Sequence, residues 1–98
     1  MAGTKFKVYV QNGEQIMAVY TDLNDSKENE IYEGSILEYS TGYRAVVKID
    51  SGSFITDSGH SSKFLYADLA NNKPIVVGSI YENPKMLYKK GNPKYYKK

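Results

Sequence analysis

The sequence predicts an all-β protein: a small antiparallel barrel or sandwich of five to seven strands, with at most one short helix. Three stretches support this class. Residues 34–56 read as strand, turn, strand, tight turn and strand; residues 5–20 alternate around Asn12-Gly13; and residues 75–81 form a further apolar strand. Val, Ile, Tyr, Phe and Thr favour a pleated, half-buried surface, and glycine supplies the positive φ that tight hairpin turns need.

Residues 5–20 give the clearest hairpin signal. Asn-Gly is the dipeptide that two-residue type I′ turns prefer. With Asn12-Gly13 as the turn, Gln11 faces Glu14 and the same pairing continues back along both strands. Opposed residues of an antiparallel pair share a face, so one face collects the apolar side chains. We expect this face to enter the core: Phe6, Val8, Val10, Met17 and Val19.

The central strands supply the rest of the predicted core. Residues 35–39, 44–49 and 53–56 alternate or are rich in β-branched side chains, with Gly42 and Gly52 in the intervening turns. Residues 63–70 are expected to form a single helical turn, with an alternating strand as the other interpretation. Gly78 is expected to mark a bulge or a close approach. The remaining core residues are predicted to be Ile36 or Leu37, Ala45, Val47, Ile49, Ile75 and Val77.

The central run resembles the middle of a bacterial Src-homology-three-like barrel. In that family a glycine opens the second strand, an aromatic residue follows the next turn, and a glycine lies in the turn to the fourth strand; Gly34, Tyr43 and Gly52 hold these places here. The resemblance covers residues 16–80 and implies a small barrel. Because the chain has no tryptophan and no proline-binding motif, recognition of peptidoglycan or proline peptides does not carry over.

Composition excludes several classes of site. The 98 residues suit one domain, and the absence of cysteine excludes disulfides, a thiolate nucleophile and cysteine-ligated metals. No apolar run approaches the roughly 18 residues of a membrane span, and Met1 begins no apolar signal segment, so we expect a cytoplasmic protein.

Two clusters have the residue types of known sites without the required arrangement. With Asp22 as the first position of a calcium loop, Lys27 occupies the sixth, where glycine is needed. Asp57, Ser58 and His60 are residue types of a hydrolase triad, but neighbours in one loop rarely converge as a triad, and no Gly-x-Ser-x-Gly elbow is present. We therefore expect no metal, no cofactor and no enzymatic activity.

Tyrosine and acidic residues indicate a protein partner. The chain has ten tyrosines, and tyrosine is enriched where proteins meet. An acidic stretch at residues 22–38 would suit a basic partner, or one that normally holds nucleic acid. We expect a non-enzymatic protein-binding module and, as the narrower hypothesis, an inhibitor or structural component encoded by a phage or mobile element. The candidate contacts are Tyr32, Tyr39, Tyr43, Asp22, Asp25, Glu28 and Glu30.

Residues 83–98 are predicted to be a basic tail following a β-barrel domain at residues 1–82. Two copies of an Asn-Pro-Lys motif, at residues 83–85 and 92–94, each lead to tyrosine and a lysine pair. The alternative function is sequence-tolerant nucleic-acid binding; the other interpretation is a solubilising tail whose first copy packs Met86 and Leu87 on the barrel. The candidate anion contacts are Lys85, Lys89, Lys90, Lys94, Tyr95, Tyr96, Lys97 and Lys98.

Salt dependence tests the tail. If its lysines bind single strands, the logarithm of the affinity should fall with the logarithm of the salt concentration at a slope of about −2 to −4. We expect the binding to be weak, to vanish at physiological salt and to be abolished by truncation after Tyr81, as measured by fluorescence anisotropy of a labelled oligonucleotide. Binding that survives the truncation would place the site on the barrel.

Overall fold

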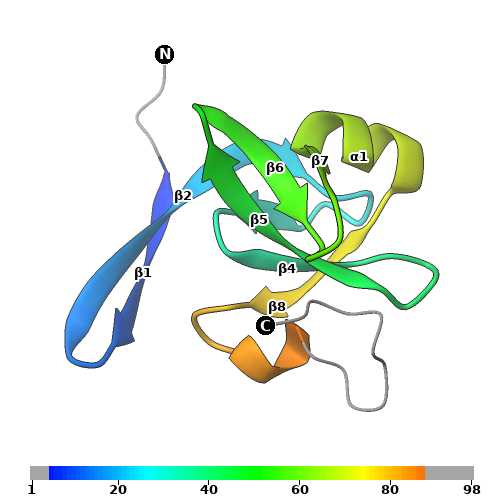
Figure 1. The fold of residues 1–98 in the computed structure, drawn as a ribbon. Coiled ribbons are helices and arrows are strands. Elements are labelled where there is room, and N and C mark those ends of the chain that lie inside the picture. The colour runs from blue at the N-terminus through cyan, green and yellow to red at the C-terminus, as the bar shows by residue number, and fades with distance from the viewer. Residues whose placement is uncertain (1–4, 88–98) are drawn as a thin grey trace.

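The computed structural model describes residues 5–87 of the chain. These residues form strands, one α-helix and one 3-10 helix (Figure 1). The elements in chain order are β1 (Phe6–Gln11), β2 (Glu14–Asn24), β3 (Glu30–Tyr32), β4 (Ser35–Glu38), β5 (Arg44–Asp50), β6 (Ser53–Asp57), β7 (Ser62–Phe64), α1 (Leu65–Asn72), β8 (Ile75–Ser79) and the 3-10 helix η1 (Pro84–Leu87).

The strands form two antiparallel sheets, which confirms the all-β class. One sheet has the order β1-β2-β3, and the other has the order β7-β6-β5-β4-β8. The described part of the chain thus has eight strands rather than five to seven, and no pairing there closes them into one barrel. The β1–β2 hairpin extends away from the five-stranded sheet (Figure 1). Within residues 5–87 no helix is long and apolar enough to cross a membrane.

The predicted hairpin register is confirmed, but the predicted buried face is wrong. Gln11 pairs with Glu14, and the ladder runs without interruption to Phe6 opposite Val19. Val19 is half-buried, while the other four apolar residues of this face are exposed: Phe6 by 44%, Val8 by 50%, Val10 by 69% and Met17 by 57%.

The opposite face of the hairpin packs against the rest of the protein, because its tyrosines contact other aromatic rings there. The Tyr9 ring lies 5.3 Å from the Tyr81 ring, and the Tyr20 ring lies 5.4 Å from the Tyr32 ring. Ala18, between them on the same face, is completely buried. Tyrosine buries a large ring and keeps a polar hydroxyl, so a face that is polar by composition can still be the packed one.

The core lies on both sides of the central strands. Leu37 and Val47 pack on one side, and Ile36 and Val46, their neighbours in sequence, pack on the other. Strands β4 and β5 are therefore covered on both faces. Ile49 was predicted to be buried, and this is wrong: it is 54% exposed, because it lies near the tip of the β5–β6 hairpin opposite Phe54.

Helix α1 is longer than the single turn predicted. Its eight residues bury Leu65 and Asp68, which are three positions apart and so share a face. The helix ends at Asn72, and its C-cap residue Lys73 has a left-handed φ of 50°. The prediction for Gly78 is confirmed, since the β4–β8 register shifts beside it and a side chain there would overlap Asn83 and Met86.

Gly34 joins the two sheets at a point where no side chain fits. It lies between β3 and β4 with a φ of +89°, and an added Cβ would overlap the Tyr81 ring. Its N–H donates to the Val47 carbonyl at 2.8 Å, and its own carbonyl accepts the Ile80 N–H at 2.9 Å. The Tyr81 hydroxyl in turn donates to the Glu33 carboxylate, at 2.7 Å and 2.8 Å from its two oxygens.

Replacing Gly34 with alanine should destabilise the protein more than the same change at Gly42. Both glycines have φ near +90°, but an alanine at position 42 would meet open space. Backbone strain should cost each variant about 1–3 kcal/mol, and overlap with Tyr81 should add about 1–3 kcal/mol for Gly34→Ala alone. Urea unfolding measures both free energies. Equal losses would show that the Tyr81 contact does not constrain position 34.

Candidate functional site

Two of the predicted partner contacts are inside the protein. Tyr32 is 4% exposed, and Asp25 is 6% exposed. Four N–H groups donate to the Asp25 carboxylate: the backbone amides of Lys27 at 2.8 Å, Asn29 at 2.9 Å and Val76 at 2.9 Å, and the Asn29 side chain at 2.9 Å. Asp25 thereby folds the β2–β3 loop and ties it to β8, so its role is structural.

In the rest of the acidic stretch, two carboxylates are paired with cations. Glu30 forms an ion pair with Lys5 and accepts the Tyr32 hydroxyl at 2.8 Å. Further along, Glu38 pairs with Arg44 at 3.2 Å. Asp22 and Glu28 remain exposed, and both have a left-handed backbone conformation, with φ of 67° for Asp22 and 70° for Glu28. A basic partner would thus meet Asp22 and Glu28, while Glu30 and Glu38 are already paired with Lys5 and Arg44.

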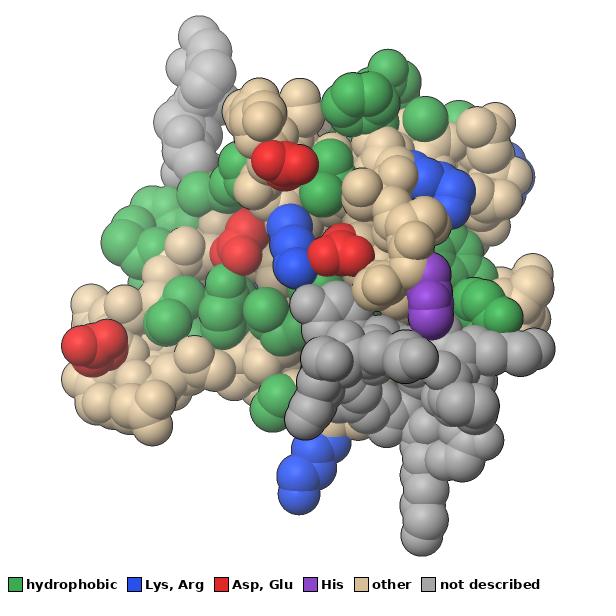
Figure 2. Space-filling view, viewed as in Figure 1, with side chains coloured by type: hydrophobic (Ala, Val, Ile, Leu, Met, Phe, Trp, Pro, Cys, Tyr) green, Lys and Arg blue, Asp and Glu red, His purple; other side chains and the backbone are tan. Residues whose placement is uncertain are grey.

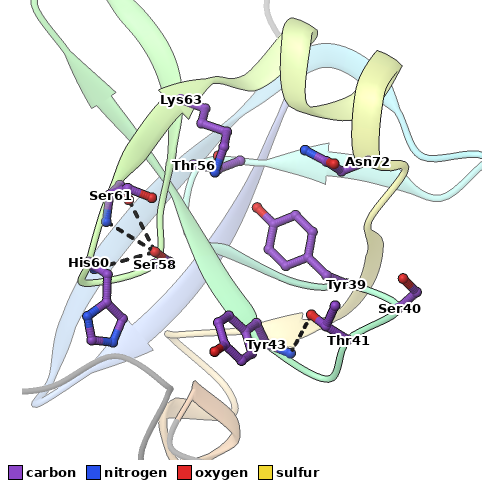
Figure 3. A pocket seen from close by; sticks show the side chains of 10 residues that line it. All are labelled: Tyr39, Ser40, Thr41, Tyr43, Thr56, Ser58, His60, Ser61, Lys63 and Asn72. Atoms are coloured by element: carbon purple, nitrogen blue, oxygen red, sulfur yellow. Dashed lines mark hydrogen bonds between the residues drawn. The ribbon is translucent and has the colours of Figure 1, made fainter.

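The other two candidate tyrosines, Tyr39 and Tyr43, line a cleft of about 690 Å³ (Figure 3). One wall is the turn between β4 and β5, and the other is the loop between β6 and β7. The volume falls in the range of about 300–1,000 Å³ that is typical of ligand pockets. The lining residues are Tyr39, Ser40, Thr41, Tyr43, Thr56, Ser58, His60, Ser61, Lys63 and Asn72.

Asp68 of helix α1 fixes the inner part of this cleft. It is 1% exposed. Its carboxylate accepts the Tyr39 hydroxyl, the Thr56 hydroxyl at 2.9 Å and the Asn72 amide at 2.7 Å. Burial, and then the hydrogen bond to Asp68, raises the pKa of Tyr39 well above its usual value. Tyr39 therefore stays a protonated donor, and the cleft has a polar but fixed floor.

The triad residue types in the β6–β7 loop are bonded to other groups. The Ser58 hydroxyl donates to the Ser61 carbonyl at 3.2 Å, and it accepts the His60 backbone amide at 3.4 Å (Figure 3). The Asp57 carboxylate accepts Lys48 Nζ and the Gly59 amide, both at 2.8 Å. Burial raises the pKa of Asp57, but these two bonds outweigh it and hold that pKa below its usual value. None of these contacts joins a serine hydroxyl to an imidazole or an imidazole to a carboxylate.

Of the predicted anion contacts, Lys85 lies within the described residues, on η1. Met86 and Leu87 of the first copy pack on the β-sheet there, since Leu87 is buried against Ile36 and Val46 with Met86 beside them. Lys89, Lys90, Lys94, Tyr95, Tyr96, Lys97 and Lys98 lie outside the described residues. In residues 5–87 no three His, Asp or Glu side chains gather as a metal site.

Sequence reasoning missed a surface on the β1–β2 hairpin. We call it the hairpin face: the exposed side chains of Phe6, Val8, Val10 and Met17, with the half-buried Val19 at its end. All five share one side of the β1–β2 ladder. Figure 2 shows hydrophobic side chains over the region in which Figure 1 places this hairpin. The alternation of apolar residues that predicts a buried face is also the signal for this surface.

Two comparisons with known proteins bear on the chain. The family model described as YopX protein matches residues 2–88, which is most of the sequence. No curated protein matches the chain.

Asp25 should make the protein sensitive to acid. Burial raises the pKa of Asp25, but its hydrogen bonds from Val76, Asn29 and Lys27 outweigh this and hold the pKa below 3.8. A lowered folded-state pKa contributes stability at neutral pH, and that contribution is lost as pH falls through the folded pKa. Asp25→Asn should therefore lower the free energy of unfolding by about 1–3 kcal/mol at pH 7. The side-chain amide N–H of the asparagine would face N–H donors that now bind the carboxylate.

The difference between wild type and Asp25→Asn should shrink below about pH 4, as measured by urea unfolding across pH 3–7. The exposed Asp22→Asn variant is the matched control and should change stability by less than about 0.5 kcal/mol. A constant gap down to pH 3 would contradict this account of Asp25.

Proposed function

The chain belongs to the YopX protein family, and from this premise we propose that it is a non-enzymatic protein-binding module whose binding surface is the hairpin face. The narrower hypothesis is an inhibitor or structural component encoded by a phage or mobile element. The exposure of four large apolar side chains on one projecting sheet face supports the proposal most directly.

Contiguous exposed apolar patches mark interaction sites, because covering them removes apolar area from water at about 25 cal/mol per Å². The hairpin face also has the expected surroundings of an interface. The polar Gln15, which lies opposite Val10 on this face, borders it at the turn end, and interfaces combine an apolar centre with a polar rim. A partner that covers Val8 and Met17, which face each other across the ladder, would bury the centre of the patch.

The hydrogen bonds of the β6–β7 loop support a binding role over a catalytic one. Ser58 directs its hydroxyl at a backbone carbonyl, and Asp57 is engaged by Lys48. A nucleophile needs a base within hydrogen-bond reach and a third group to orient that base. The loop instead has the bonds of a closed turn. Tyr39 and Tyr43 line the cleft beside it and are proposed as a secondary contact region.

The substitution Met17→Lys should remove partner binding without unfolding the protein. Met17 is 57% exposed, so Met17→Lys places a charge at the centre of the hairpin face at little cost to folding. Ile49→Lys is the matched control, because Ile49 is 54% exposed but lies on β5, outside the hairpin. Proteins captured by the immobilised full chain from a lysate of its host should be retained by Ile49→Lys and lost with Met17→Lys.

Equal retention by both variants, with unchanged circular dichroism, would contradict the assignment of the hairpin face. So would a wild-type chain that retains no protein.

A further inference from the structure

Within residues 5–87, strand β1 has an open edge. It is the outer strand of its sheet there, and β2 is its neighbour on the other side. The Tyr20 N–H donates to the Lys5 carbonyl at 2.7 Å, so Lys5 and Tyr20 are a hydrogen-bonded pair of the ladder. Because hydrogen-bonded and non-bonded pairs alternate, Lys7, Tyr9 and Gln11 bond to β2, and Phe6, Val8 and Val10 direct their N–H and C=O groups to the open edge.

This edge lacks most of the features that usually prevent strand pairing, and the lysine of β1, Lys7, lies over the Tyr32 ring on the other face of the hairpin. Proteins protect edges with proline, a bulge, a short strand or a charge at the edge. Here β1 has six residues and no proline, and its ladder with β2 has no register shift. The three outward-bonding residues are all apolar and exposed.

We propose that β1 pairs antiparallel with β1 of a second copy of this chain, around a twofold axis at Val8. Phe6 would then face Val10 of the second copy, and Val8 would face its own counterpart. In this register every outward N–H and C=O of the three residues is paired, and their side chains meet on the same face. The inference goes beyond the proposed function, because it uses the edge of β1 rather than the hairpin face.

The charges of β1 favour this register over its neighbours. With the axis at Val8, Lys7 faces Tyr9 and Lys5 faces Gln11 of the second copy. An axis at Lys7 would set two lysines directly opposite each other, which is destabilising. An axis at Tyr9 would move Phe6 opposite the Asn12 turn, beyond the end of the strand.

A second copy suits this edge because β1 is complementary to itself. The sequence Phe-Lys-Val-Tyr-Val has apolar residues at equal spacing on either side of Val8, so the reversed strand presents the same alternation. A twofold interface requires this, since each residue must suit its partner in both directions. Pairing would also join two hairpin faces into one continuous apolar surface.

Single cysteines test the register, since the chain has none of its own. Across the proposed axis, the two Val8 Cα atoms would lie about 5.5 Å apart, within the usual disulfide range of about 4.4–6.8 Å. The two Val10 residues would be offset by four positions, or about 14 Å along the strands. Full-length Val8→Cys should become a covalent dimer under mild oxidation, and Val10→Cys should remain monomeric, on a non-reducing gel.

The unmodified chain should sediment with the mass of two copies at high concentration. Equal cross-linking at positions 8 and 10, cross-linking at neither, or a monomer at every concentration would overturn the proposal. Adding Met17→Lys separates this result from the proposed function, because Met17 lies on β2, away from the edge. Val8→Cys with Met17→Lys should still cross-link, whereas partner capture should be lost.

Discussion

The contact between Tyr81 and Gly34 determines which face of the hairpin belongs to the core. Gly34 leaves room for the Tyr81 ring, and Glu33 holds the Tyr81 hydroxyl. Burial, and then the bond to Glu33, raises the pKa of Tyr81, so its hydroxyl remains a donor at neutral pH. The ring is therefore fixed where Tyr9 of β1 meets it. Once Tyr9 faces inward, the alternation of the strand turns Phe6, Val8 and Val10 outward.

This arrangement gives the hairpin two separate surfaces for association. Its outward face is apolar, and within residues 5–87 the outer edge of β1 pairs with no other strand, so the two can be used by different molecules at the same time. Meanwhile its inward face is held by rings and by two lysines, Lys7 over the Tyr32 ring at 4.8 Å and Lys5 over the Tyr20 ring at 5.4 Å. Lys5 and Lys7 thus contribute to packing and do not cover the outward face.

The pairing of neighbouring strands could be predicted from the sequence, whereas the contacts between distant segments could not. Asn12-Gly13 determined the hairpin register, because a two-residue turn leaves one way to align the strands. The burial of Ala45 and Val47 followed from their place in a β-branched strand flanked by two others. The buried face of the hairpin could not be predicted, since both faces have apolar bodies and the choice depends on Tyr81, far away in the chain.

The candidate site was hidden for the same reason. Asp25 reads as part of a solvated acidic loop, yet its carboxylate accepts the amide of Val76, 51 residues later. The cleft combines Tyr39, Thr56 and Asn72 from three separate elements around Asp68. No local sequence pattern predicts such a cluster, because each residue type is common in the kind of segment where it lies.

Amide hydrogen exchange along β1, followed residue by residue in dilute and concentrated protein, tests the central claim that this strand has an open edge. The amides of Lys7, Tyr9 and Gln11 should exchange slowly at both concentrations, since they bond to β2. The amides of Phe6, Val8 and Val10 should exchange fast in dilute protein and become slow as copies pair. Slow exchange of these three in dilute monomer, or fast exchange at every concentration, would contradict the account.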